Sequence, residues 1–254
     1  MLYAAAQAQR LGLEVAVVTA CSADVEPASI LPGVRWHVLP SEATTTFENI
    51  YRDGVRQQRL LDVGRLITAE DLPAEWMSAP LLLLTTLFHE ISPDVAQEFI
   101  DRGATVGLGA QGWLRRREGD QVRPVPFEPE PDWLAGEVVF VSEEDLAAAE
   151  RVAEWRDQVR VVVLTRGSGG CTVWDVKGRH DVSAAPVTQV DPTGAGDVFA
   201  ASFLARYADE HDALESARFA AAAAALSVRG EGTSAIAGLD EIEAVLRAGQ
   251  VKVA

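Results

Sequence analysis

The chain has 254 residues, of which 48% are hydrophobic and 24% are charged, proportions that are typical of a globular protein. Its 22 Lys and Arg residues against 38 Asp and Glu residues give a formal net charge of −16. A field of that sign repels nucleic-acid phosphates and anionic lipids, so we expect neither nucleic acid nor a membrane as a partner. The length fits a single α/β domain over residues 1–254.

Cysteine and histidine give no sign of disulfide or zinc chemistry. Cys21 and Cys171 lie in separate apolar runs, which is typical of two reduced core thiols. The 4 histidines stand alone, without the spacing of a helical zinc site. No apolar run reaches the roughly 18–20 residues needed to span a bilayer. The first twelve residues also lack the basic start of a signal peptide, so we expect a cytoplasmic protein.

Helix and strand patterns alternate along the chain, which predicts a mostly parallel sheet flanked by helices. A helix over 2–11 ends at Gly12, and the apolar, β-branched run over 13–19 predicts a buried strand. The expected strands that follow cover 80–86, 104–109, 138–142, 159–165, 171–175 and 187–190. The expected helices that follow cover 93–102, 143–155, 197–208, 213–228 and 239–248.

Residues 34–67 interrupt this alternation because they have no helical period. Segments 44–51 and 55–63 have the composition of strands, and Asp53-Gly54 between them is typical of a hairpin turn. Their mixed polar and apolar pattern places them outside the core, as a flap, a lid or a dimer-forming sheet. A purely structural β-arm explains the pattern equally well. We call residues 34–67 the lid segment, and we expect a Pro-rich, charged loop over 115–133.

One glycine pattern resembles a dinucleotide-binding fingerprint without its context. Gly107, Gly109 and Gly112 have the GxGxxG spacing and follow a predicted strand. In a dinucleotide fold the third glycine opens a helix, whereas here Trp113, Leu114 and three arginines follow it. We therefore reject a dehydrogenase that binds NAD through this motif. A Walker A loop is absent, since no GxxxxGK occurs in the sequence.

A stronger pattern is DPTGAGD at residues 191–197, between a predicted strand and a predicted helix. Gly194, Ala195 and Gly196 let the backbone approach a ligand closely, and the amides at a helix start form a cradle for an anion. Asp197 lies beside this cradle, where a carboxylate can accept a proton from an attacking hydroxyl. The alternative is that Asp197 caps the helix and the glycines form a tight turn. The complete seven-residue string favours the functional interpretation.

A second glycine-rich loop, TRGSGG over 165–170, follows another predicted strand. Loops at the carboxyl ends of strands are where α/β sheets bind ligands. Taken alone, this loop is better explained as a hairpin into the next strand. The basic residues of the chain are almost all Arg, so two glycine loops make a nucleotide-phosphate site the simplest joint explanation.

The string DPTGAGDVFAASFL resembles the C-terminal signature of the PfkB family of carbohydrate kinases, which are similar to ribokinase. The lid segment, the TRGSGG loop and residues 232–234 lie along the chain in the same order as in that family. The resemblance implies a ribokinase-like three-layer α/β sandwich with a mostly parallel central sheet and a small β lid. It also implies transfer of the ATP γ-phosphate to a hydroxyl of a small sugar, polyol or nucleoside. ATP and Mg²⁺ are then the expected cofactors, and a monovalent cation stays open.

The resemblance also assigns roles to residues. Asp197 matches the family's general base, and the amides of Gly194, Ala195 and Gly196 match its anion hole. The residues implied to bind the nucleotide are Thr165, Arg166, Gly167, Gly170, Thr193, Gly232, Thr233 and Ser234. The residues expected near the acceptor substrate are Thr46, Phe47, Asn49 and Gln111. Each of these four also has an ordinary structural explanation, because a Thr-rich strand is simply a good strand.

Ser142 and Asp145 stand where the family often has an N-x-x-E motif that helps to organise Mg²⁺. The resemblance therefore implies a metal role for this pair, with Asn replaced by Ser and Glu by Asp. The alternative is structural, because Ser142 followed by acidic residues is a good helix N-cap with an acidic first turn.

Family members carry a first strand, a substrate-binding Asp and a glycine pair ahead of the helix that begins here near Met1. The resemblance therefore predicts a sheet that lacks this first strand. A truncated start, a differently built substrate site and lost activity all stay open as explanations. Lost activity would make the chain a nucleotide-binding, catalytically inactive member with an interaction or regulatory role. We also expect the exposed edge of the lid segment to form a homodimer.

Overall fold

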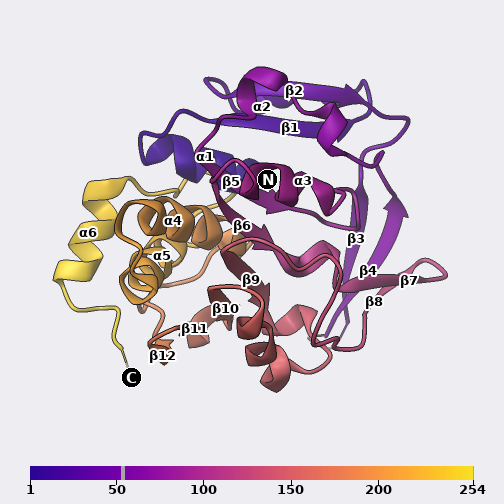
Figure 1. The fold of residues 1–254 in the computed structure, drawn as a ribbon. Coiled ribbons are helices and arrows are strands. Elements are labelled where there is room, and N and C mark those ends of the chain that lie inside the picture. Colours follow the sequence, from indigo (N-terminus) through magenta and orange to yellow (C-terminus); the bar gives the residue numbers. More distant parts are fainter. Residues whose placement is uncertain (53–54, 254) are drawn as a thin grey trace.

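A six-stranded sheet forms the centre of the protein in the computed structural model, which describes residues 1–52 and 55–253 (Figure 1). Its strand order is β12-β11-β10-β9-β6-β5. The strands β5, β6, β9 and β10 run parallel, whereas β11 and β12 pair antiparallel at one edge. Their bounds are β5 Leu81–Thr85, β6 Thr105–Gly109, β9 Val138–Ser142, β10 Val161–Thr165, β11 Cys171–Asp175 and β12 Gly178–Val182.

Helices cover both faces of this sheet. One hydrophobic cluster packs α4, α5 and α6 against one face, and a second cluster packs α3 and the 3-10 segment η5 against the other. The α-helices are α1 Leu2–Arg10, α2 Pro27–Ile30, α3 Asp94–Ile100, α4 Ala195–Glu210, α5 Ala213–Ser227 and α6 Leu239–Arg247. The arrangement confirms the predicted three-layer sandwich with a mostly parallel sheet. No helix in the described ranges has both the length and the apolar character needed to cross a membrane.

Two strands form a separate parallel sheet, β1 Ala16–Cys21 with β2 Arg35–Pro40 (Figure 1). The apolar run of β1 predicts a strand covered on both faces, yet residues 17–20 are only half-buried. The edge strand β5 shows the same mismatch, because four consecutive leucines there are mostly half-buried. Both strands line the large cavity described below. The apolar residues of both strands are therefore only half-buried because they line that cavity.

A small four-stranded sheet lies beside the main sheet, with the order β3-β4-β8-β7 (Figure 1). Its strands are β3 Thr46–Arg52, β4 Val55–Asp62, β7 Arg115–Glu118 and β8 Gln121–Pro124. The lid segment supplies β3 and β4, while the third strand of that segment, β2, pairs with β1 instead. The predicted turn at Asp53-Gly54 lies outside the described residues.

The loop predicted over 115–133 is wrong in its first half, because β7 and β8 form an antiparallel hairpin there. β8 joins β4 through the pair Arg59 and Gln121. Apart from the buried Arg115, the charged side chains of this hairpin are exposed, and its strands carry no apolar alternation that a sequence pattern could detect.

Two other predicted elements differ from the structure. The helix over 143–155 is replaced by two 3-10 segments, η4 Glu143–Asp145 and η5 Ala149–Asp157, with extended Leu146 between them. Buried contacts of Asp145, described below, take the chain out of the helical path. The strand over 187–190 is absent, because Val187 and Val190 are exposed beyond the edge of the sheet. The remaining 3-10 segments are η1 Ala69–Asp71, η2 Ala74–Trp76, η3 Ala110–Gly112 and η6 Gly167–Gly169.

The two cysteines are free and buried, as expected for core thiols. Burial raises the pKa of the Cys171 thiol to about 12. This thiol is therefore protonated at neutral pH and has no nucleophilic role.

Candidate active site

The DPTGAGD loop forms the turn that starts α4. Gly194 is the residue just before the helix, and its φ of 78° places it in the left-handed region that favours glycine. A Cβ atom added there would lie 2.1 Å from Cγ of Tyr3, so α1 packs its tyrosine ring directly against this glycine. Desolvation of Tyr3, with the nearby carboxylates of Asp191 and Asp197, raises the pKa of the phenol. Backbone conformation and close packing both require glycine at position 194.

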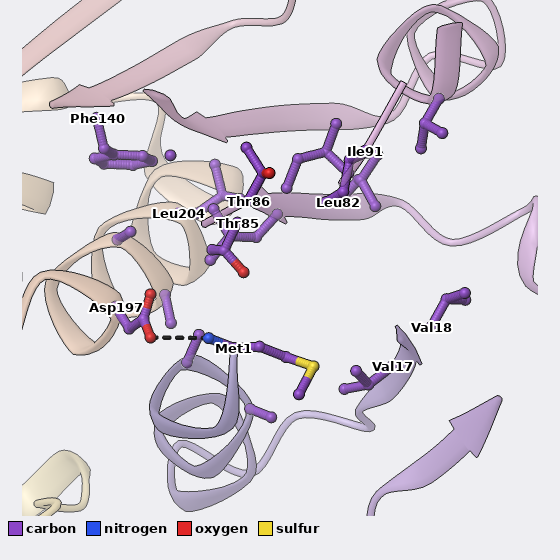
Figure 2. Close-up of a pocket in the computed structure, with 18 of the residues that line it drawn as sticks. Met1, Val17, Val18, Leu82, Thr85, Thr86, Ile91, Phe140, Asp197 and Leu204 are labelled. Carbon is purple, nitrogen blue, oxygen red and sulfur yellow. Dashed lines mark hydrogen bonds and ion pairs between the residues drawn. The ribbon is translucent and has the colours of Figure 1, made fainter. Parts of the chain in front are cut away.

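Asp197 lies in the first turn of α4 and lines the cavity. Its Oδ2 accepts a hydrogen bond from the α-ammonium of Met1 at 2.9 Å (Figure 2). The side chain is 29% exposed, so the carboxylate is accessible from the cavity as well as paired. The structure thus places the predicted base in the first turn of α4, where the helix dipole favours negative charge.

The predicted anion-hole amides lie at this helix start, where the first four N–H groups have no partner within the helix. One of them is already engaged, because the Ala195 N–H donates to the carbonyl of Pro192 at 3.2 Å. At Gly196 an added Cβ would meet no atom within 4 Å, so this side of the turn is open. The open side faces the same cavity as Asp197.

Asp191 holds this loop in shape, a role that the sequence analysis did not assign. Its Oδ1 accepts from the Thr193 N–H at 2.9 Å, and its Oδ2 accepts from the Gly232 N–H at 3.1 Å. The carboxylate therefore joins the DPTGAGD loop to residues 232–234. The hydrogen bonds from Thr193, followed by that from Gly232, hold the pKa of Asp191 below its usual value. The sequence does contain a signal for this turn, because an Asp side chain often accepts a hydrogen bond from the backbone N–H two residues later.

Replacing Asp191 with Asn tests this link through the pH dependence of stability. A group whose pKa is lowered by folding stabilises the protein above its unfolded-state pKa, near 3.9, and this contribution is lost as the pH falls through the folded-state value. We expect Asp191→Asn to be less stable than the wild type at pH 7, with the difference shrinking at pH 3. Urea unfolding of the variant and the wild type at pH 7 and pH 3 measures this difference in the free energy of unfolding. Asp132→Asn, which removes an exposed carboxylate elsewhere, should show no such convergence.

The TRGSGG loop follows β10 and turns through 3-10 segment η6. Gly170 has a φ of 83°, and a Cβ there would lie 2.0 Å from the carbonyl oxygen of Val182, so the loop backbone packs against β12. The Arg166 guanidinium donates to Thr172 at 2.6 Å and to Asp181 at 3.3 Å. Its charge thus faces β11 and β12. At Gly167, by contrast, an added Cβ would meet no atom within 4 Å.

The predicted nucleotide residues divide into two sets. Thr165 and Thr193 line the cavity with Asp197, whereas the rest of the set lies outside it. The residues outside are Arg166, Gly167, Gly170, Gly232, Thr233 and Ser234. The Asp191 carboxylate connects the two sets, because it accepts from Thr193, which lines the cavity, and from Gly232, which lies outside it.

Ser142 and Asp145 do not fit a directly coordinated Mg²⁺. The Ser142 hydroxyl accepts from the Glu144 N–H at 3.3 Å, which is the capping alternative. Asp145 is buried, and its two carboxylate oxygens accept from Arg115 at 3.0 Å and from Gln111 at 2.9 Å. Among the residues that the structure describes, no group of three or more His, Cys, Asp or Glu side chains is placed to hold a metal. We therefore assign no protein ligand to Mg²⁺.

The cavity has a volume of about 2190 Å³, well above the roughly 300–1,000 Å³ of a single ligand site. Figure 2 shows Met1 and Asp197 at one side, with Val17 and Val18 of β1 facing Leu82 and Thr85 of the β5 strand across it. Three of the predicted acceptor residues line the cavity, namely Phe47, Asn49 and Gln111. Thr46 is not among the lining residues, and its hydroxyl donates to the Thr44 carbonyl at 2.8 Å.

Comparisons with known proteins agree on one family. Residues 126–238 match the family model of the pfkB family carbohydrate kinases. The chain is 29% identical over 206 residues to inositol 3-kinase of Oryza sativa subsp. japonica, covering 76% of this chain and 51% of that protein. It is 33% identical over 200 residues to cytidine kinase of Thermococcus kodakarensis, covering 72% of this chain and 65% of that protein. The chain thus spans only part of the length of these relatives.

Solved structures show the same fold. A pyrophosphate-dependent myo-inositol-1 kinase, converted by mutation into a myo-inositol-3 kinase, superposes with a TM-score of 0.80 at 22% identity, covering 95% of this chain and 88% of that one. The ribokinase of Arabidopsis thaliana, complexed with ribose and ATP, superposes with a TM-score of 0.72 at 21% identity, covering 97% and 86%. The ribokinase-like fold is thereby confirmed. Together with the signature that starts α4, the match over residues 126–238 shows that this part of the chain is similar to the pfkB family carbohydrate kinases, within a ribokinase-like fold.

Proposed function

We propose that this protein is an ATP-dependent kinase that transfers the γ-phosphate to a hydroxyl of a small sugar, polyol or nucleoside. One observation carries the proposal: the Asp197 carboxylate lines a large cavity at the open N-terminus of α4. A proton acceptor and a set of anion-binding amides thus share one turn of chain. Phosphoryl transfer to an alcohol needs this pair of functions.

The chemistry follows from that arrangement. An acceptor hydroxyl in the cavity gives its proton to Asp197 as its oxygen attacks the γ-phosphorus, and ADP leaves. The amides of the 194–196 turn, with the dipole of α4, stabilise the charge on the phosphoryl oxygens during transfer. Mg²⁺ would neutralise charge on the nucleotide phosphates, to which it binds. The chain's own contribution is to position the hydroxyl, accept the proton and stabilise the anion.

The acceptor class is drawn from the relatives and from the cavity. The matched relatives include inositol 3-kinases, fructokinases and a cytidine kinase, which act on a polyol, a sugar and a nucleoside. Neutral polar side chains such as Asn49 and Gln111 line the cavity beside charged ones, and their amide groups can bind hydroxyl groups. We therefore propose an uncharged polyhydroxy acceptor.

A coupled assay of ADP release tests the proposal. The wild-type chain with ATP and Mg²⁺ is given myo-inositol, fructose, ribose and cytidine in turn, and we expect turnover with at least one of them. A parallel series replaces ATP with pyrophosphate and measures the release of orthophosphate, because the myo-inositol kinase of similar fold is pyrophosphate-dependent. Absence of turnover with every acceptor and both donors would contradict the proposal.

A second candidate function is nucleotide binding without catalysis, in a regulatory or interaction role. The contacts of Asp145 favour it, because Arg115 and Gln111 take up both carboxylate oxygens at the position where the family's motif helps to organise Mg²⁺. Calorimetric binding of ATP without any consumption of it would support this candidate.

We also propose that β3 and β4 act as a lid over the cavity within one domain, and that two copies pair through the lid edge. In the described part of the chain, β3 is an edge strand of the small sheet. An unpaired edge of this kind can extend its sheet into a second copy. Light scattering of the purified 27.3 kDa chain should give twice that mass.

A further inference from the structure

The buried side chain of Arg115 joins three separate parts of the protein. It begins β7 of the small sheet and is 5% exposed. Its Nη2 donates to Asp145 at 3.0 Å, just after β9 of the main sheet. Its Nη1 donates to the carbonyl of Leu87 at 3.2 Å, just after β5. The guanidinium also lies 5.3 Å from the ring centroid of Phe47 on β3.

The backbone of Arg115 strengthens the same junction. Its carbonyl oxygen lies 2.7 Å from Nε2 of His89. His89 has a φ of 56°, a left-handed conformation that costs free energy for a residue other than glycine. Next to it, the Glu90 carboxylate accepts from the Leu87 N–H at 2.8 Å. The loop after β5 is thus held by its own hydrogen bond to Glu90 and by two contacts with Arg115, through the His89 ring and the Leu87 carbonyl.

Stability alone does not account for this arrangement. Removing an arginine and an aspartate from water costs free energy, and apolar residues of similar size often stabilise a protein equally well. The planar guanidinium, in contrast, can fix several partners in one orientation. Arg115, Asp145 and Phe47 all line the cavity that contains Asp197. The junction is therefore suited to set the position of β3 relative to the cavity.

We propose that Arg115 is a positioning residue that holds Phe47 and β3 over the acceptor part of the cavity, and that Asp145 holds Arg115 in place. The inference rests on the proposed kinase function and deepens it. An uncharged polyhydroxy acceptor gains affinity when a ring covers it and excludes water. The predicted nucleotide loop at 165–170 lies after β10 and does not include this junction. Loss of Arg115 therefore weakens acceptor binding and leaves ATP binding unchanged.

The test compares Arg115→Met with Arg116→Met. Methionine keeps the length of the side chain without its charge, and Arg116 is the next residue, whose guanidinium pairs with exposed Glu118 at 2.8 Å. We expect Arg115→Met to raise the acceptor KM roughly tenfold, as loss of a desolvated cation–π contact and its partners implies, with an unchanged KM for ATP. Phe47→Leu, which keeps an apolar side chain but removes the ring, should raise the same KM. Arg116→Met should behave as the wild type.

A double variant separates positioning from stability. Arg115→Met leaves the Asp145 carboxylate buried without its cation, which lowers Tm. Adding Asp145→Leu should restore Tm while the acceptor KM stays high. A KM that recovers together with Tm, or one that never changes, would show that the pair is only structural and overturn the proposal.

Hydrogen exchange provides a readout that needs no activity. In the absence of substrate, the amides of β3 should exchange faster in Arg115→Met than in the wild type or in Arg116→Met. If the wild type phosphorylates no acceptor, the proposed function fails, yet faster exchange of β3 still supports the holding role of Arg115. Unchanged exchange in β3 would overturn it in either case.

Discussion

Asp197→Asn is expected to slow phosphoryl transfer by about 10²–10⁴-fold while ATP still binds. The amide has the size and shape of the carboxylate, so the turn that starts α4 keeps its geometry. It cannot accept the proton of the attacking hydroxyl at neutral pH, because an amide is not a base of useful strength. The variant therefore separates proton transfer from binding, which is the distinction that the proposed role of Asp197 requires.

The measurement combines the rate of ADP release with calorimetric binding of ATP. Stability should change little, because the lost partner is the half-exposed Met1 ammonium and exposed ion pairs contribute about 0–1 kcal/mol. Glu210→Gln is the matched control, since it neutralises a carboxylate at the other end of α4, where Glu210 pairs with Arg206 at 2.8 Å. An undiminished rate in Asp197→Asn would rule out this residue as the base.

Continuous apolar runs made the interior of the fold predictable from the sequence. Strands β9 and β10 carry valine at six of their ten positions and lie buried between helices, where such apolar runs belong. The helix α5 is equally predictable from its apolar run, because its alanines pack against the sheet. The same rule failed for 187–190, whose two valines are exposed, since an apolar β-branched composition does not reveal whether a sheet has room for another strand.

The exposed and long-range features were not predictable in this way. The hairpin β7–β8 consists mainly of charged residues, so its pairing depends on β4, which lies more than fifty residues earlier. The buried contact of Arg115 with Asp145 joins residues thirty positions apart, and no spacing rule connects them. From the sequence alone, the Asp145 carboxylate in its acidic N-cap context fits a metal ligand or a helix turn, whereas its partners in the structure are Arg115 and Gln111.

The candidate site was predictable where one short string contains all of its parts. Asp197 and the 194–196 turn are adjacent in sequence, and the start of α4 keeps them adjacent in space. The contribution of Asp191 to the neighbouring loop needed the fold, because its second oxygen bonds Gly232, forty-one residues later. Tyr3 likewise reaches Gly194 from the opposite end of the chain.

Gly194→Ala is expected to have the second large effect, on both stability and rate. A left-handed φ costs a residue other than glycine about 1–2 kcal/mol, and the added methyl group must also displace the ring of Tyr3. Moving the ring or the turn shifts the amides that we propose to bind the phosphoryl group. Loss of one donor of this kind slows a reaction by about 10²–10³-fold. We therefore expect a lower Tm together with a rate reduced by that factor.

Gly249→Ala separates the two causes, because Gly249 has a φ of 65° and an added Cβ would meet no atom within 4 Å. Its loss of Tm measures the backbone cost alone, and the further loss in Gly194→Ala measures the displacement of Tyr3. Combining Gly194→Ala with Tyr3→Ala removes the collision, so the double variant should lose less stability than the sum of the two single variants. Strict additivity would mean that the ring does not constrain the turn. A wild-type rate in Gly194→Ala would contradict the proposed anion hole. It would mean that displacing the amides of the 194–196 turn does not affect phosphoryl transfer, so the phosphoryl group would have to bind elsewhere.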